Sequence, residues 1–396
     1  MPDGPAHPPG DGVPDGLHLH AAGAWGVVAT RGDRLFVGPD ERSLSERGRV
    51  PTDLGTTHRL ATRAMRHRAT RSLLTGVVGR FVTHTVHRID ADHLLATNGR
   101  WVLRSIDGGR TWERSRRLPR SSPPFGVLGS GICSSGDEVL VGEYPQRPTR
   151  PPNVLRSTDR GSTWSTIPIQ SVRHIHAVQV DPYDDAIWIT TGDADDECRI
   201  LRLRDGDLDV AGGGSQMWRA VELAFTPDAI LWGMDCGFAE HNPIYKLERD
   251  AIGRADPTVV HRLDGSIYYS ATVELDEGLA IAFSSAVETG SDSWVGSGRD
   301  HSTDAASVVV STDASAFREW TEVGRFRKRR ALSAHIPGDH VPIANAYIFL
   351  EAHDGALLLN PFNTAVKDGR IIRTEVHAPR SSGVDGRVRS RAGHSR

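Results

Sequence analysis

The sequence predicts an all-β protein folded as a β-propeller of four-stranded blades, seven by repeat count, with six as the alternative. Three observations carry this prediction. A short apolar strand introduced by Asp, Glu or Asn recurs along the 396 residues, other strand-like runs flank each copy, and one twelve-residue phrase is written twice. Few segments have the apolar periodicity of a helix.

The recurring strand marks the repeat unit. Its copies are DRLFVG, DHLLAT, DEVLVG, DAIWIT, DAILWG, EGLAIA and NAYIFL, which begin at Asp33, Asp92, Asp137, Asp185, Asp228, Glu277 and Asn345. Apolar, partly β-branched residues after a turn residue are typical of a hairpin that leads into a buried strand. We interpret each copy as the second strand of a blade. The first and last units are irregular and could share one blade, which leaves six blades as the alternative.

The repeated phrase reads RSIDGGRTWERS from Arg104 and RSTDRGSTWSTI from Arg156. Aspartate at the start of a tight turn accepts hydrogen bonds from backbone N–H groups further along it. Glycine supplies a positive φ, and tryptophan packs between neighbouring sheets. We therefore expect the phrase to hold the turn between the third and fourth strands rather than to carry chemistry.

The phrase resembles the Asp-box, or BNR repeat, of sialidases and related propellers. Two copies match the pattern S-x-D-x-G-x-T-W in full, at 105–112 and 157–164, and a degenerate copy spans 311–320. The resemblance is strongest to uncharacterised prokaryotic, sialidase-like members of the family. It implies a structural role, on the perimeter and away from the active site, for Asp107, Gly109, Trp112, Asp159, Gly161 and Trp164.

Composition outlines the domain organisation. Polar segments rich in small residues predict a disordered leader over residues 1–22 and a disordered tail over 376–396, flanking a propeller over 23–375. No basic segment followed by an apolar one resembles a secretory signal, and no apolar stretch is long enough to span a membrane. Together with three widely spaced cysteines, these observations favour a cytoplasmic location.

Charge excludes one class of partner. The net charge is −3, and the basic clusters at 63–71 and 325–330 accompany no nucleic-acid motif. We therefore expect no nucleic-acid partner. The expected ligand is a glycan or another carbohydrate, and a protein partner is the alternative.

Strand direction places the candidate site. In a four-stranded blade, the turns between strands one and two and between strands three and four share one face of the ring. The repeated phrases occupy that face, so we expect the site on the other one. Residues there would converge on one mouth of the central channel, although ordinary solvated loop residues are the alternative interpretation.

The candidate residues follow second strands or precede first strands. The predicted catalytic residues are Asp193, Asp235, Glu288 and Tyr268, and the predicted substrate-binding residues are His174, His176, Arg173, Arg219, Trp218 and Glu143. The same interpretation also places Asp40, Glu41, Glu351 and His353 at this mouth.

A histidine pair adds one further hypothesis. His174 and His176 lie two residues apart on a predicted strand, so both imidazoles lie on one side. Such a pair binds a metal when a carboxylate such as Asp193 faces it. In the alternative, the two histidines hydrogen-bond sugar hydroxyls or channel carboxylates. We expect no other cofactor.

Function stays open between three classes. The resemblance implies a sialidase-like site, for which the candidates are Arg173 and Arg219 for a substrate carboxylate, Tyr268 or Tyr269 with Glu288 as nucleophile pair, and Asp193 or Asp235 as acid. The family's early Arg-Ile-Pro motif is missing. A glycoside hydrolase or lyase, a non-catalytic carbohydrate- or protein-binding propeller, and a scaffold for another enzyme therefore all remain.

Overall fold

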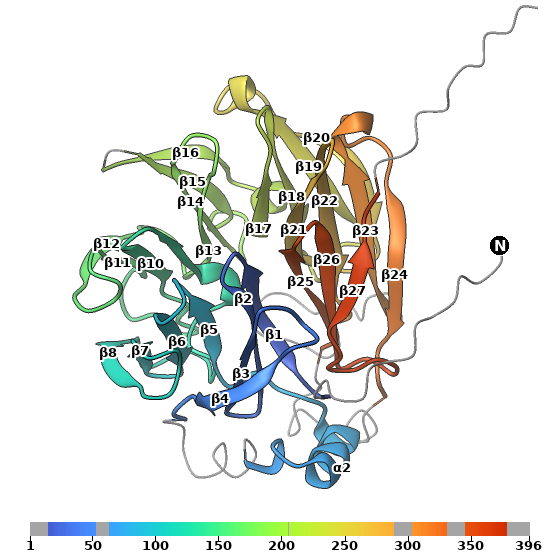
Figure 1. Cartoon of the computed structure of the whole chain (residues 1–396). Coiled ribbons are helices and arrows are strands. Elements are labelled where there is room, and N and C mark those ends of the chain that lie inside the picture. Colours follow the sequence, from blue (N-terminus) through green and yellow to red (C-terminus); the bar gives the residue numbers. More distant parts are fainter. Residues whose placement is uncertain (1–14, 53–62, 205, 289–302, 331–344, 378–396) are drawn as a thin grey trace, which may run out of the picture.

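The strands of the chain follow one another around a ring (Figure 1). The computed structural model describes residues 15–52, 63–204, 206–288, 303–330 and 345–377. These residues form seven antiparallel sheets, six of four strands and a last one of three. The predicted β-propeller is therefore confirmed, with seven blades rather than six.

Each of the first three blades is one continuous stretch of chain. Blade 1 contains β1 (His18–Gly23), β2 (Gly26–Arg31), β3 (Arg34–Gly38) and β4 (Ser45–Arg49). Blade 2 contains β5 (Thr85–Arg88), β6 (Leu94–Asn98), β7 (Trp101–Ser105) and β8 (Glu113–Arg117). Blade 3 contains β9 (Ile132–Ser135), β10 (Glu138–Gly142), β11 (Asn153–Ser157) and β12 (Ser165–Pro168).

The other four blades are also continuous in sequence. Blade 4 contains β13 (His174–Val180), β14 (Ile187–Gly192), β15 (Arg199–Arg204) and β16 (Asp207–Gly213). Blade 5 contains β17 (Ala220–Phe225), β18 (Ala229–Met234), β19 (Asn242–Glu248) and β20 (Thr258–Leu263). Blade 6 contains β21 (Ile267–Leu275), β22 (Gly278–Ser285), β23 (Ala305–Thr312) and β24 (Thr321–Arg327). Blade 7 contains β25 (Tyr347–His353), β26 (Ala356–Phe362) and β27 (Ile372–Glu375).

Helical segments lie in the connections. The α-helix α2 (Arg68–Val78) connects blades 1 and 2, and the 3-10 turns are η1 (Gly129–Gly131), η2 (Gln216–Trp218), η3 (Arg249–Ala251) and η4 (Asp313–Ser315). No helix within the described part of the chain has the length and apolar character needed to cross a membrane.

The core lies between neighbouring blades. Every residue of β18 is buried, and so is every residue of β6. A strand covered by packed side chains on both faces needs apolar residues at successive positions, which explains why these strands read as continuous apolar runs. Trp188 and Trp232 lie in one buried cluster that joins blades 4 and 5.

The predicted strand order is wrong at both ends of the chain. Five of the seven recurring runs are second strands, but the run at Asp33 forms the third strand β3 and the run at Asn345 forms the first strand β25. Asp40 and Glu41 therefore follow a third strand, and His353 ends a first strand. All three lie on the face opposite the expected mouth, where His353 Nε2 contacts the carbonyl oxygen of Pro39 at 3.0 Å.

The predicted boundary of the leader also needs correction. Residues 18–22 belong to β1, because the sequence HLHAAG pairs with GVVATR as a hairpin. The last described strand, β27, ends at Glu375. The remainder of the predicted leader and nearly all of the predicted tail lie outside the described residues.

Among the described residues, the ring closes without exchanging a strand between its ends. Blades 1 and 7 lie side by side (Figure 1), and each comes from one end of the chain. The backbone N–H of Leu19 donates to Asn360 Oδ1 at 2.9 Å, and the N–H of Leu17 donates to the carbonyl of Gly369 at 2.8 Å. The expectation that the end units could share one blade is therefore wrong.

Both repeated phrases form the turns between third and fourth strands, as expected. In the turn at 105–112, Asp107 Oδ1 accepts hydrogen bonds from the backbone N–H groups of Arg110 and Thr111, both at 2.9 Å. Gly109 has a φ of 88°, and the Trp112 indole donates to its carbonyl at 3.2 Å. The turn at 157–164 repeats the aspartate contacts.

These turns also pack on the preceding blade. An added Cβ on Gly109 would lie 2.2 Å from Leu35 Cδ2 in blade 1, and one on Gly161 would lie 2.8 Å from Leu95 Cδ2 in blade 2. The Trp164 indole donates to Ser115 Oγ in blade 2 at 2.6 Å. The repeated phrase therefore joins neighbouring blades in addition to holding its own turn.

The degenerate copy at 311–320 occupies the corresponding turn between β23 and β24. Phe317 has a φ of 59°, a value that glycine adopts more readily. The Trp320 indole donates to the Phe317 carbonyl at 3.0 Å, as Trp112 does to Gly109. The tryptophan contact is thus kept although the glycine is lost.

Candidate functional site

The central channel is a cavity of about 1190 Å³. The first strands of all seven blades contribute to its lining, and so do loops on the face that we expected to carry the site. A cavity of this size with convergent polar groups is the usual form of a small-molecule site.

Several first strands carry a register shift of the kind seen at a β-bulge. In β1, β13 and β21 the shift leaves one residue without a partner on the second strand: His20, His176 and Tyr268. All three residues line the channel. Bulges change the direction of a side chain and are common beside functional sites, so these shifts help to aim the three side chains inward.

Most of the predicted site residues come together at one mouth of the channel. Those that line it are Arg173, His174, His176, Asp193, Arg219, Asp235, Tyr268 and Glu288. They come from blades 4, 5 and 6, either near the start of a first strand or after a second strand. The predicted convergence is therefore present in the structure, while the roles of these residues stay predictions.

Two predicted substrate-binding residues lie elsewhere. Trp218 is 5% exposed and stacks on Trp232 within the core, with ring centroids 5.4 Å apart. Glu143 is buried and accepts hydrogen bonds from both Nη atoms of Arg150 at 2.8 Å. Neither residue lines the channel. Glu143 points away from it because neighbouring residues of an extended segment point in opposite directions, whereas Trp218, at the end of η2, packs into the core.

Two further tyrosines line the channel. Tyr144 follows Glu143 and takes the inward position, with its ring 4.2 Å from that of His174. Tyr347 begins β25, and its ring lies 5.5 Å from that of Tyr268. The sequence places Tyr144 at this mouth together with Glu143, and alternation could have favoured Tyr144 as the binding residue. Tyr347 was missed because the run at Asn345 was interpreted as a second strand, whereas it forms the first strand of its blade.

Arg219 links two carboxylates at the mouth. Its Nη2 lies 3.1 Å from Asp193 Oδ1, and its Nε lies 3.4 Å from Asp235 Oδ2. Burial raises the pKa of Asp235 above its usual range, although Arg219 opposes this shift. Burial alone would also raise the pKa of Asp193, but the close contacts with His174 and His176 hold it well below its usual range.

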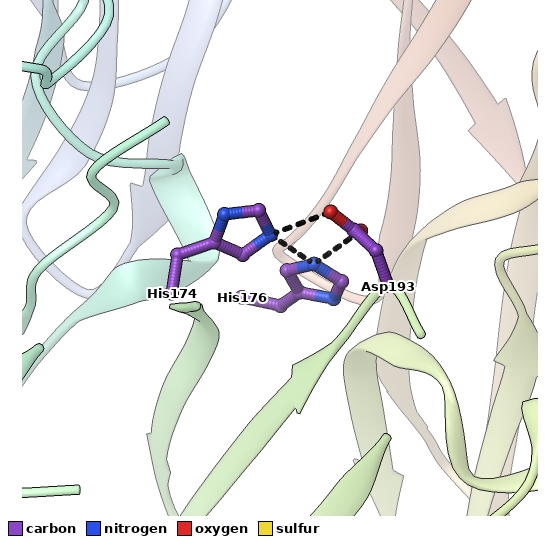
Figure 2. Close-up of side chains that lie close together, drawn as sticks. All are labelled: His174, His176 and Asp193. Atoms are coloured by element: carbon purple, nitrogen blue, oxygen red, sulfur yellow. Dashed lines mark hydrogen bonds and ion pairs between the residues drawn. The ribbon is translucent and has the colours of Figure 1, made fainter. Parts of the chain in front are cut away.

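The histidine pair faces Asp193 directly (Figure 2). His174 Nε2 lies 3.1 Å from His176 Nε2 and 3.2 Å from Asp193 Oδ2, and His176 Nε2 lies 3.6 Å from Asp193 Oδ1. Burial lowers the pKa of His174. Among the described residues these three form a group with metal-ligand chemistry, whose ligand atoms all lie within 4.8 Å of one another.

A tyrosine and a glutamate form a second pair at the mouth. The Tyr268 hydroxyl donates a hydrogen bond to Glu288 Oε1, and Ser266 Oγ donates to Glu288 Oε2 at 3.0 Å. Burial, followed by the charges of Asp235 and Glu288, raises the pKa of Tyr268 well above its usual value. The phenol is therefore protonated at neutral pH and needs a base in order to act as a nucleophile.

Two further acids line the same channel. Glu222 in β17 accepts a hydrogen bond from the backbone N–H of Ser270 at 2.6 Å. Burial raises the pKa of Glu222 to about 8, and burial together with the charge of Glu222 raises the pKa of Glu351 to about 8. Glu351 thus lines the channel as predicted, although its strand is the first of its blade.

Comparison with known proteins agrees with the fold. No protein-family model and no curated protein matches the chain, so the resemblance to Asp-box propellers depends on the repeated turns. Among solved structures, YCF48 from Cyanidioschyzon merolae is 14% identical with a TM-score of 0.50, over 92% of this chain and 97% of that one. An ancestral GH74 enzyme, AFV00434, is 10% identical with a TM-score of 0.49, over 94% of this chain and 46% of that one.

A GH74 enzyme from Niastella koreensis is 11% identical with a TM-score of 0.45, over 88% of this chain and 42% of that one. This chain therefore spans less than half the length of either GH74 enzyme. The similarity to YCF48, at a TM-score of 0.50 and 14% identity, shows a shared fold and carries no activity or ligand across.

Proposed function

We propose that the chain is a sialidase-like glycoside hydrolase that acts at the channel mouth, with Tyr268 and Glu288 as nucleophile pair and Asp235 as acid. The observation that carries this proposal is the hydrogen bond from the Tyr268 hydroxyl to Glu288, inside a channel that Asp235 also lines. A retaining glycosidase needs a nucleophile and an acid/base, and tyrosine serves as nucleophile in sialidases.

Each residue has a defined role in the proposed reaction. Glu288 accepts the phenolic proton as the Tyr268 oxygen bonds to the anomeric carbon, and Asp235 donates a proton to the departing glycosidic oxygen. Water then attacks the same carbon and gives a proton to Asp235, while the Tyr268 oxygen leaves and recovers its proton from Glu288. The raised pKa of Asp235 suits a group that must start protonated.

Arginines at the mouth favour an acidic sugar as substrate. Arg173 and Arg219 both line the channel, and guanidinium groups bind carboxylates in a bidentate manner. A carboxylate on the sugar would compete with Asp193 for these groups. The uncharged phenol of Tyr268 also avoids repulsion with such a substrate.

Aromatic side chains support a second candidate, a non-catalytic carbohydrate-binding propeller. The channel is lined by Tyr144, Tyr269, Tyr347 and Phe349 as well as by Tyr268. Aromatic rings present apolar faces with large contact areas, which suit stacking against a sugar ring. In this alternative the acids and arginines bind hydroxyl and carboxylate groups without turnover.

A panel of neutral and acidic aryl glycosides, including an α-sialoside, tests both candidates. The proposal expects hydrolysis by the wild-type chain and a loss of about 10²–10⁴-fold in kcat/KM for Tyr268→Phe and for Asp235→Asn. Tyr245→Phe is the matched control, because Tyr245 lies in the core between blades 4 and 5. Saturable binding without hydrolysis would favour the second candidate, and neither binding nor hydrolysis would overturn both.

A further inference from the structure

We propose that His174, His176 and Asp193 bind one divalent transition-metal ion of the Zn²⁺ class, on the blade 4 side of the channel mouth (Figure 2). Two imidazole nitrogens and one carboxylate oxygen form a ligand set that Zn²⁺ and its neighbours in the first transition row accept. This inference does not depend on the proposed hydrolase activity, because none of the three ligands is a catalytic residue of the proposed reaction.

The spacing of the ligand atoms fits one ion. Metal–ligand bonds of about 2.0–2.2 Å in a tetrahedral arrangement place neighbouring ligand atoms about 3.3 Å apart. The two Nε2 atoms lie 3.1 Å apart, and His174 Nε2 lies 3.2 Å from Asp193 Oδ2. One ligand atom from each of the three residues lies within 4.8 Å of the other two. Small side-chain adjustments therefore suffice to bring all three to a shared centre.

Hydrogen bonding presents the nitrogen lone pairs to this centre. His176 Nδ1 lies 3.0 Å from the carbonyl oxygen of Ala220, and a carbonyl only accepts, so Nδ1 carries the proton. The neutral ring then has an unprotonated Nε2, which faces His174 Nε2. An imidazole whose other nitrogen donates to a carbonyl is the arrangement that metal-binding histidines adopt.

His174 is buried at 4% exposure, and its Nδ1 has no hydrogen-bond partner among the described residues. In a metal-free pair its Nε2 must donate a proton toward His176 or Asp193, and Nδ1 is then an unsatisfied acceptor. Metal binding at Nε2 would move the proton to Nδ1 and release the close contact between two nitrogens. The buried pair therefore gains a partner suited to both lone pairs.

The arginines hold Asp193 in position rather than exclude the ion. Arg219 Nη2 contacts Asp193 Oδ1 at 3.1 Å, and the Gln216 amide donates to the Asp193 backbone carbonyl at 2.9 Å. Oδ2 points toward His174, with Arg173 Nη1 at 3.4 Å as its other neighbour. Oδ2 is therefore the ligand oxygen, and Arg219 is the group that orients the carboxylate from behind.

Three protein ligands leave a further coordination position. All three residues line the channel, so this position would open into the cavity rather than into the core. Open sites of this kind bind water or an oxygen atom of a ligand. With Arg173 and Arg219 nearby, an anionic oxygen donor is the expected occupant.

Metal titration of the purified full chain, stripped with a chelator and freed of any affinity tag, tests the proposal. With ZnCl₂ as titrant, calorimetry is expected to show one ion per wild-type chain, and His174→Gln and His176→Gln are expected to weaken binding by more than about 100-fold. His87→Gln is the matched control, since His87 also lines the channel but contacts Ser134 at 2.9 Å. Circular dichroism melting confirms that each variant is folded.

Co²⁺ supplies an independent readout, because tetrahedral nitrogen and oxygen ligation gives a strong visible absorption that His174→Gln should abolish. The proposal is overturned if the wild-type chain binds no stoichiometric Zn²⁺, or if His87→Gln loses as much affinity as His174→Gln. The titration uses no glycan, so its outcome is separate from that of the glycoside panel.

Discussion

The side-chain oxygen of Asn360 in β26 accepts a hydrogen bond from the backbone N–H of Leu19 in β1, at 2.9 Å. The amide nitrogen of Asn360 donates in turn to the carbonyl oxygens of Leu17 and Arg370, at 3.3 and 3.0 Å. Asn360 is fully buried. One asparagine thus joins the last blade to the first, between which no strands pair in the part of the chain that the structure describes.

Asn360→Leu should therefore lower the free energy of unfolding by about 1–3 kcal/mol, because it leaves buried backbone groups without partners. Urea denaturation measures the change. Asn98→Leu is the control: Asn98 is also buried, but its side chain makes one hydrogen bond to the described residues, to the Pro51 carbonyl, so a smaller loss is expected. Equal stability of Asn360→Leu and the wild type would contradict the role assigned to Asn360.

Gly109→Ala should destabilise the protein more than Gly214→Ala does. The two glycines have nearly the same φ, 88° and 91°, so each substitution carries the same backbone cost of about 1–2 kcal/mol. The new methyl group at Gly109 would meet Leu35 at 2.2 Å, whereas nothing lies within 4 Å of it at Gly214. Thermal melts of both variants measure the difference, and equal losses would show that this contact with blade 1 is unimportant.

Glu222→Gln should stabilise the chain at alkaline pH. A carboxyl group whose pKa rises from 4.5 to about 8 binds its proton more tightly in the folded state. The stability it contributes is therefore fully present below about pH 4.5 and is lost as the pH rises through about 8. Glutamine keeps an oxygen for the Ser270 N–H and does not ionise.

Measuring the free energy of unfolding at pH 5 and pH 9 tests this expectation. Glu222→Gln should raise this free energy more at pH 9 than at pH 5. The exposed Glu113→Gln is the control and should leave the pH profile unchanged. A gain from Glu222→Gln of the same size at both pH values would show that ionisation of this carboxyl is not the cause.

Asp159→Asn should lower stability at neutral pH and lose that effect in acid. Hydrogen bonds from the backbone N–H and hydroxyl of Thr163 lower the pKa of Asp159 from 3.8 to about 2. The stabilisation is therefore present above about pH 4 and disappears as the pH falls through about 2. Melting temperatures at pH 7 and pH 2.5 measure it, with the exposed Asp209→Asn as control.

The fold was predictable because its signals are local and repeated. The pairs Asp107–Gly109 and Asp159–Gly161 mark equivalent turns, and apolar second strands recur at similar spacing. Once the face of the turns was fixed, strand direction alone brought Asp193 and Asp235 to one mouth. The same reasoning failed for Asp40, because the strand before it is the third of its blade and not the second. Taking one for the other exchanges the two faces of the ring.

Other features depend on contacts that no local pattern records. Trp218 and Arg219 are adjacent, and only packing decides that the tryptophan enters the core and the arginine enters the channel. The register shift in β13 leaves His176 without a partner and helps to turn its side chain inward, and no residue pattern in the sequence indicates this shift. Asn360 contacts Leu19 across almost the whole length of the chain, so the sequence could not indicate this pair.

Contiguity of every blade in the sequence has a consequence for how such a chain can change over generations. When a terminal blade is assembled from both chain ends, gain or loss of a repeat must preserve that composite unit. Here the described strands of blades 7 and 1 come from opposite ends of the chain and do not mix, so gain or loss of one blade would leave the described strands of the other blades in place. The number of blades would then change by one at a time, and the width of the central channel would change with it.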